Sequence, residues 1–161
     1  MERRMTLKAG GVRAHQLRVI ILKPSKYMAD GYVERFRWGF MPNSTVPYMR
    51  SMTPSVLDDT PVEVHTVDEY VHTDLQYMSL LDRPQGVRTL LALVGVQSHQ
   101  FHRALDLAAY ARRRGCMAII GGPHVMTCDT SLLRWTRPGL PFISFARFPA
   151  PSSTATSWLK G

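Results

Sequence analysis

The fold is decided by residues 89–122, which read TLLALVGVQSHQFHRALDLAAYARRRGCMAIIGG. The segment opens with a continuous apolar run at residues 89–96, which is typical of a strand covered on both faces of a parallel sheet. Four polar residues interrupt the run, and apolar residues then recur at helical spacing from Phe101 onward. A second apolar run at residues 117–120 follows the helix, so the segment predicts one right-handed βαβ unit.

The carboxyl ends of these two parallel strands are expected at one edge of the sheet, where ligands of such folds bind. At that edge, Gln97, Ser98 and Gln100 supply amide and hydroxyl groups near the free N–H groups of a helix start. Gly121 and Gly122 follow the second strand and allow the backbone to approach a ligand closely. The sequence therefore predicts a binding surface for a large ligand with amide or phosphate groups, rather than a catalytic constellation.

Three further strands complete the predicted sheet. A first strand at residues 17–22 ends at a Lys-Pro pair, and an alternating, half-exposed strand at residues 62–67 is expected beside it. A run at residues 140–145 gives the weakest pattern of the five, because its prolines restrict it to a sheet edge. The expected fold class is an α/β, flavodoxin-like doubly wound parallel sheet with strand order 2-1-3-4-5.

Two more helices and a long loop lie between these strands. Asn43-Ser44-Thr45 can cap a helix over residues 45–52, and a short amphipathic helix is expected over residues 75–81. The loop at residues 27–48 interleaves aromatic residues with arginines, a pattern that can stack on RNA bases. A loop or ligand lid folded over the sheet edge is the favoured interpretation of the same residues, because long loops in compact domains usually cover sites.

The chain of 161 residues has the length of one domain, and we divide it into three parts. Residues 1–16 are expected to form a flexible arm, residues 17–129 the α/β domain, and residues 130–161 a basic, Ser/Thr/Pro-rich tail that cannot bury enough surface to order itself. The formal charge of +8 is concentrated at the two ends, since residues 130–161 contain no acid. A nucleic-acid platform is therefore disfavoured.

Other function classes find little support in the sequence. No apolar run approaches the length of a membrane span, and no signal core follows the first residues, so a cytoplasmic protein is expected. Cys116 and Cys128 cannot make a disulfide framework or a four-ligand zinc site, and Cys116 is interpreted as a small buried residue. The enzyme alternative is a histidine-based metal hydrolase that uses His99, His102 and His124, with Asp106 four residues after His102, although no glutamate stands near them as a general base.

One known family resembles this sequence. The run LVGVQSHQFHRALDLA at residues 93–108, followed by IIGGPH at residues 119–124, resembles the N-terminal cobalamin-binding domain of the B12-binding radical SAM proteins. The resemblance implies a flavodoxin-like domain that holds cobalamin flat against the carboxyl edge of the sheet. The cofactor-binding residues that it implies are Val96, Gln97, Ser98, His99, Gln100, Phe101, Gly121, Gly122, Pro123 and His124. Gly121 to His124 would line the channel for the nucleotide tail.

Three motifs of cobalamin-binding or radical SAM proteins are absent from the sequence. It lacks the Asp-x-His-x-x-Gly motif that supplies a histidine to cobalt in methionine-synthase-like domains, so no protein ligand is expected and His99 is the nearest candidate. It also lacks the Gly-Glu-Gly-Glu segment and the Cys-x3-Cys-x2-Cys motif of the family, so no iron–sulfur cluster is expected. We therefore expect a truncated product, frame-shifted near Ser131, that binds cobalamin without being catalytic alone.

The missing radical SAM domain would then be a partner on a separate chain. The binding alternative is a flavodoxin-like module that takes another phosphate-bearing cofactor or acts as a protein interaction domain.

Overall fold

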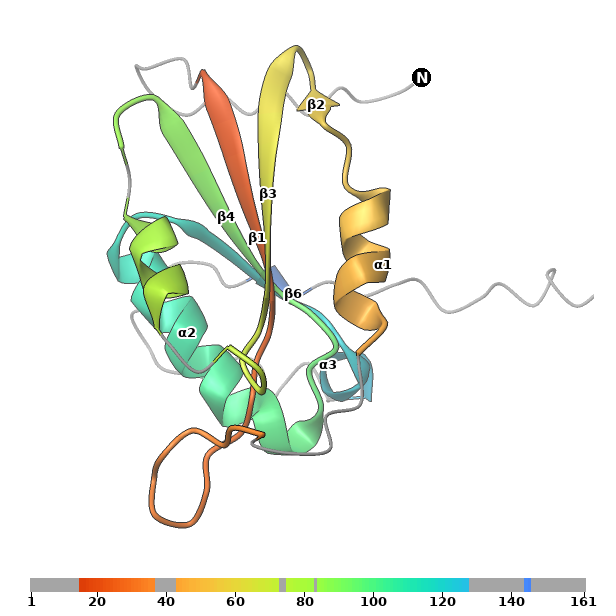
Figure 1. The fold of residues 1–161 in the computed structure, drawn as a ribbon, viewed down its shortest axis with the longest axis vertical. Helices are drawn as coiled ribbons and strands as arrows, with labels where there is room; N and C mark the ends of the chain where they lie inside the picture. The colour runs from red at the N-terminus through yellow and green to blue at the C-terminus, as the bar shows by residue number, and fades with distance from the viewer. Residues whose placement is uncertain (1–14, 37–42, 73–74, 83, 128–143, 146–161) are drawn as a thin grey trace, which may run out of the picture.

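A computed structural model describes residues 15–36, 43–72, 75–82, 84–127 and 144–145. The chain forms an α/β fold around one mostly parallel sheet (Figure 1). The strands are β1 (Gln16–Lys23), β2 (Val56–Leu57), β3 (Thr60–Asp68), β4 (Val87–Leu93), β5 (Met117–Ile120) and β6 (Ser144–Phe145). Most of the predicted arm, most of the predicted tail and Cys128 lie outside the described residues. Gln16, the last residue of the predicted arm, instead belongs to β1, where it pairs with Val87 of β4.

The order of the strands in space is β2-β3-β1-β4-β5-β6, which differs from the predicted 2-1-3-4-5. The cause is β2, an antiparallel strand of two residues paired with the start of β3. The sequence indicates only a turn there, and the structure makes that turn from Asp58 and Asp59, both at positive φ. A hairpin turn of this kind favours Asp and Asn, which tolerate the left-handed conformation. β3 itself lies beside β1 in parallel register, as the alternating pattern predicts.

The helices are α1 (Thr45–Met52), η1 (Gln76–Leu81), η2 (Ser98–Gln100), α2 (Phe101–Arg113) and α3 (Pro123–Thr127). α1 packs on one face of the sheet, and α2 and η1 pack on the other (Figure 1). The predicted helix at residues 75–81 is a 3-10 helix, and α3 begins within the segment predicted as a loop. Pro123 fits the first turn of α3, where a missing N–H costs nothing.

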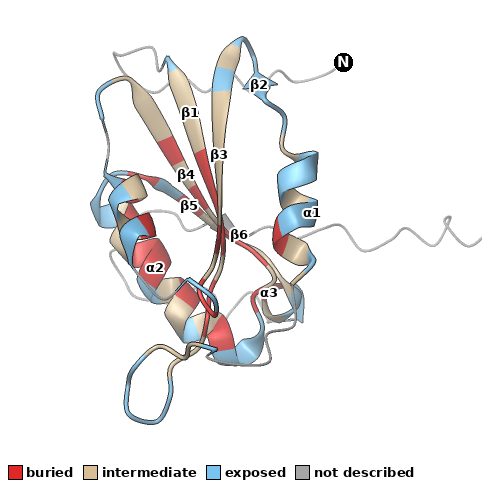
Figure 2. Ribbon diagram, in the orientation of Figure 1, coloured by how far each residue is buried: buried red, intermediate tan, exposed pale blue. Residues whose placement is uncertain are grey.

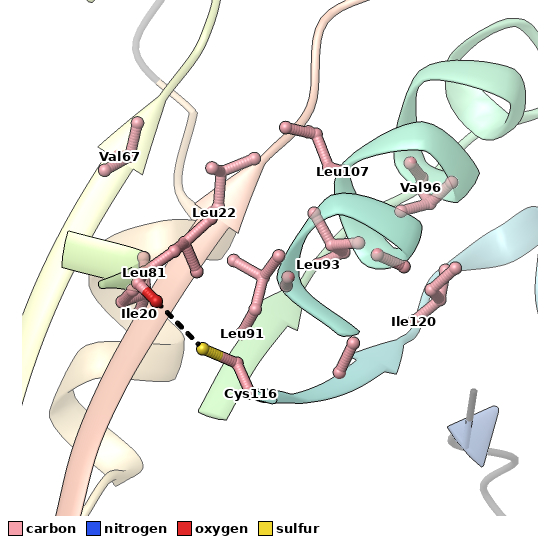
Figure 3. Packing of buried hydrophobic residues seen from close by; sticks show 14 of the residues in the cluster. Ile20, Leu22, Val67, Leu81, Leu91, Leu93, Val96, Leu107, Cys116 and Ile120 are labelled. Atoms are coloured by element: carbon pink, nitrogen blue, oxygen red, sulfur yellow. Dashed lines mark hydrogen bonds between the residues drawn. The ribbon is translucent and has the colours of Figure 1, made fainter. Parts of the chain in front are cut away.

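The hydrophobic core is largest on the α2 face. Ile20, Leu91 and Leu93 meet Leu107 of α2 there, all at most 1% exposed (Figure 3). Cys116 is buried among them and its thiol donates to the Leu81 carbonyl at 3.2 Å, which confirms it as a small buried residue.

Odd-numbered residues of β1 face the other way, where Val19 and Ile21 pack with Val46 of α1. This alternation follows from the pleat of a strand covered on both faces.

No helix in the described ranges is long and apolar enough to cross a membrane. The cytoplasmic location stays a prediction.

Candidate functional site

All ten predicted site residues lie in the segments 96–101 and 121–124, which follow β4 and β5 and include η2 and the first residues of α2 and α3. The sheet places both segments, here called the two loops, at one edge. β4 and β5 pair in parallel, with Leu93 opposite Ile120 at their last residues. The two loops therefore leave the sheet side by side. The exposed positions of this region lie between the start of α2 and α3 (Figure 2).

Backbone hydrogen bonds join the two loops directly. The Val96 N–H donates to the Gly121 carbonyl at 3.0 Å, and the His124 N–H donates to the Val96 carbonyl at 3.1 Å. The Gly121 N–H donates to the Leu93 carbonyl at 2.8 Å, which extends the β4–β5 pairing beyond the last strand residue. The loops consequently form one continuous surface at this point.

Gly122 is the residue that permits this contact. It has a φ of +146°, and a Cβ added to it would lie 2.1 Å from the Val96 nitrogen and 2.7 Å from the Val96 oxygen. Any side chain would collide with backbone, which cannot move aside as a flexible side chain can. The sequence predicts that the bare backbone of Gly122 faces a ligand, whereas in the structure it faces Val96.

Three side chains of the first loop, Gln97, Ser98 and His99, are exposed. Pro123 is exposed in the second loop, and the half-buried His124 connects the two loops through its side chain. Its Nδ1 lies 3.0 Å from the Ser98 hydroxyl oxygen, and its ring centroid lies 4.4 Å from that of Phe101. The outer surface of the two loops therefore presents amide, hydroxyl and imidazole groups.

Gln100 behaves differently from its neighbours, because its side chain is buried and only 2% of the residue is exposed. Its Oε1 accepts the Gln97 N–H at 3.0 Å, and its Nε2 donates to the Tyr70 hydroxyl at 3.3 Å. The sequence groups Gln100 with the ligand-facing residues, whereas in the structure it supports the loop from beneath.

A buried ionic network occupies the neighbouring part of the same edge. Glu69, immediately after β3, is fully buried, and Arg103 in the first turn of α2 pairs with it at 2.7 Å. The Glu69 carboxylate also accepts the Ser25 N–H at 3.0 Å and a hydrogen bond from the Tyr77 hydroxyl. Four segments of the chain are thereby joined at one carboxylate: the loop after β1, the end of β3, η1 and α2.

The network sets the protonation of its members. Burial alone would raise the pKa of the Glu69 carboxyl, but hydrogen bonds and charge from Arg103 outweigh it, so the pKa lies below its ordinary value. Burial raises the pKa of the Tyr77 hydroxyl, and the adjacent Glu69 carboxylate raises it further. Burial also raises the pKa of Tyr27, whose hydroxyl donates to Asp106 at 2.8 Å and accepts from Arg103 at 3.3 Å. Glu69 is therefore an ionised, fully bonded structural carboxylate.

One feature of the sequence indicates that Arg103 has a buried partner. A cation in the first turn of a helix opposes the helix dipole, so Arg103 needs a nearby anion to be stable there. Glu69 supplies it from 34 residues away in the chain, and sequence spacing cannot reveal such a distant pairing.

The described residues contain no group of three His, Cys, Asp or Glu side chains that could hold a metal ion. Asp106, which the sequence places near His102, is bonded to Tyr27 instead. The metal-hydrolase alternative therefore gains no support from the arrangement of these side chains.

Searches of protein-family models, curated proteins and solved structures found no match to this chain.

Proposed function

We propose that this chain is a cobalamin-binding module with a flavodoxin-like, doubly wound fold. In this proposal the corrin lies across the carboxyl edge of the sheet, over the loop 96–101 and the loop 121–124. The observation that carries the proposal is the direct joining of these loops, which makes one exposed polar surface on a rigid support.

The topology favours ligand binding at this edge. From β1, the chain runs through α1 to β3 on one side of the sheet, while β4 lies on the other side of β1 and leads into α2. The direction in which successive strands are added therefore reverses between β1 and β4. Because the crossovers are right-handed, this reversal places α1 and α2 on opposite faces of the sheet. Ligands of open α/β sheets bind outside the carboxyl ends of the strands at such a switch point. Gly95, in the loop after β4, lies against Thr45 at the start of α1 there.

The exposed groups suit a corrin with its amide side arms and nucleotide tail. Gln97 can donate and accept hydrogen bonds, and the Ser98 hydroxyl can do both as well. His99 is exposed, and its side chain makes no hydrogen bond to another described residue. The proposal assigns binding to this surface and leaves the radical chemistry to a radical SAM domain on a separate chain.

Titration of the purified protein with hydroxocobalamin tests the proposal. We expect a shifted corrin absorption spectrum and co-elution of the cofactor with the protein in gel filtration. A matched pair of variants locates the site. Gln97→Trp places a large side chain in the loop after β4, and Gln85→Trp places one at an exposed position just before the start of β4.

We expect Gln97→Trp to weaken binding at least about tenfold, which corresponds to ~1.4 kcal/mol, and Gln85→Trp to leave it unchanged. An unaltered corrin spectrum with the wild-type chain would refute cobalamin binding. A parallel titration with flavin mononucleotide distinguishes cobalamin binding from the alternative, in which the module binds another phosphate-bearing cofactor at the same edge.

A further inference from the structure

The exposed loop 97–99 is supported by two consecutive residues that follow β3. Glu69 bonds to Arg103, and Tyr70 bonds to Gln100. Gln100 and Arg103 are three residues apart, so they lie on the same side of one helical turn. The dipeptide 69–70 thereby holds the beginning of α2 at two points.

The two points differ in what they reach. Arg103 bonds to the ionic network and to none of the three exposed residues. Gln100 bonds to the exposed loop, because its Oε1 accepts the backbone N–H of Gln97, the first of those three residues. A buried amide with bonds on both its oxygen and its nitrogen can take only one orientation, and this orientation fixes Gln97 relative to the sheet.

Tyr70 is itself held in place. Its ring stacks on Phe36 with centroids 4.6 Å apart, and its carbonyl accepts the Phe36 N–H at 2.8 Å. Tyr70 is 7% exposed and Gln100 is 2% exposed, so water has little access to the bond between them. Phe36 lies in the segment after β1, and the ligand loop is consequently tied to that segment through buried side chains.

We propose that Gln100 is a positioning residue of the ligand surface: held by Tyr70, its buried amide sets the conformation of residues 97–99 without contacting the ligand. The inference deepens the proposed cobalamin site, on which its binding readout depends. It reassigns a residue that the sequence places among those facing the cofactor.

The test combines one readout that needs no ligand with one that does. Gln100→Met keeps the length and burial of the side chain and removes both hydrogen bonds, and Tyr70→Phe keeps the stacked ring and removes only the hydroxyl. Ile20→Val, a conservative change at a fully buried residue in the middle of β1, is the control for a general loss of stability.

In the free protein, we expect Gln100→Met to speed hydrogen exchange of the Gln97 amide about tenfold, the equivalent of one ordinary net hydrogen bond. Tyr70→Phe should produce a smaller acceleration, and Ile20→Val should produce none beyond its global effect. With hydroxocobalamin, Gln100→Met should raise the dissociation constant several-fold, while Ile20→Val should leave it unchanged.

The two proposals can fail separately. Unchanged exchange of the Gln97 amide in Gln100→Met would overturn the positioning role, whatever the cofactor does. Faster exchange with an unchanged dissociation constant would also overturn it, because the loop conformation would then not matter for binding. If the wild-type chain binds no hydroxocobalamin, the proposed function falls, and amide exchange still decides whether Gln100 fixes the loop.

Discussion

The two halves of the carboxyl edge differ in whether their polar side chains are buried and bonded to one another or exposed to water. Beside β1 and β3, the polar groups of Ser25, Glu69, Tyr77 and Arg103 are bonded to one another and largely withdrawn from water. We call these four residues the closed half. Beside β4 and β5, Gln97, Ser98, His99 and Pro123 are exposed, and we call these the open half. One sheet edge thus combines a part that stabilises the fold with a part whose groups can serve a ligand.

The difference follows from the cost of burial. A buried carboxylate is tolerated only when its partners replace the lost water, and Glu69 has Arg103, Tyr77 and the Ser25 N–H for this purpose. Residues of the open half keep their water and can exchange it for a ligand. Functional variants should therefore be sought in the open half and destabilising variants in the closed half.

The largest expected effect comes from breaking the ion pair of the closed half. Arg103→Met removes the guanidinium and leaves Glu69 buried without its counter-charge, which should lower the free energy of unfolding by about 3–5 kcal/mol. Urea denaturation followed by circular dichroism measures this loss.

Arg114→Met is the matched control, because Arg114 pairs with Asp82 at 3.2 Å in a bridge whose side chains are 37% and 69% exposed. Its loss should be about 1 kcal/mol or less. Similar losses in the two variants would mean that the closed half is no more important to stability than the surface.

A smaller effect on the free energy of unfolding is expected where the two loops of the proposed ligand surface meet. Gly122→Ala puts a methyl group 2.1 Å from the Val96 nitrogen, so the loops must separate. Gly31→Ala also occupies a positive φ, but nothing lies within 4 Å of the added carbon. Gly31→Ala should cost about 1–2 kcal/mol from backbone conformation alone, and Gly122→Ala should cost about 1–3 kcal/mol more from overpacking.

Thermal unfolding of both glycine variants provides the measurement. If the two glycine variants unfold at the same temperature, the close contact between Gly122 and Val96 is not maintained in solution.

Acid should lower the free energy of unfolding through the closed half, because Glu69 loses its charge there. The folded pKa of Glu69 lies below its ordinary value of 4.5, so the unfolded chain takes up the proton more readily. The stabilisation from Glu69 is therefore fully present above pH 4.5 and is lost as the pH falls from there through the folded pKa. Glu63, whose pKa is lowered by its bond to Arg18, acts in the same direction.

Urea denaturation at a series of pH values between neutral and strongly acidic tests this dependence. Glu69→Gln should be less stable at neutral pH and should show a shallower decline on acidification, with the remaining slope due to Glu63 and other carboxyls. An identical slope in the variant and the wild type would show that Glu69 does not titrate with folding.

The sequence predicts the fold better than it predicts the site, and the reason is the range of the interactions. Apolar runs and glycine stops depend on neighbours along the chain, so the strands at 17–22, 62–67 and 117–120 and the helix after Phe101 are confirmed. The two-residue strand β2 has no periodic pattern of its own, so the sequence misses it, and the observed order differs from the predicted one by this added edge strand.

The site depends on contacts between distant residues. Parallel pairing predicts that the loops after β4 and β5 are neighbours, and the structure places them together. Local sequence cannot tell which polar side chains turn inward, so Gln100 is grouped with Gln97 and Ser98 although it is buried. The glycine pair predicts a close approach of backbone, but it does not identify Val96 as the neighbour.

The smallest effect on stability is expected in the open half. Ser98→Ala and His99→Ala each remove an exposed polar group and should change the free energy of unfolding by less than about 0.5 kcal/mol. Ser98 does contact His124, but that pair is exposed and water can replace it. The same two variants should weaken hydroxocobalamin binding, because the groups that they remove belong to the proposed ligand surface.

The spectrum of bound cobalamin refines this last prediction. Since no histidine ligand to cobalt is expected, His99→Ala should leave the absorption bands of the bound cofactor in place while the dissociation constant rises by a few-fold. A change in those bands would instead make His99 a cobalt ligand. If either variant loses as much stability as Arg103→Met, the open half also holds the fold together, and the contrast between the two halves is wrong.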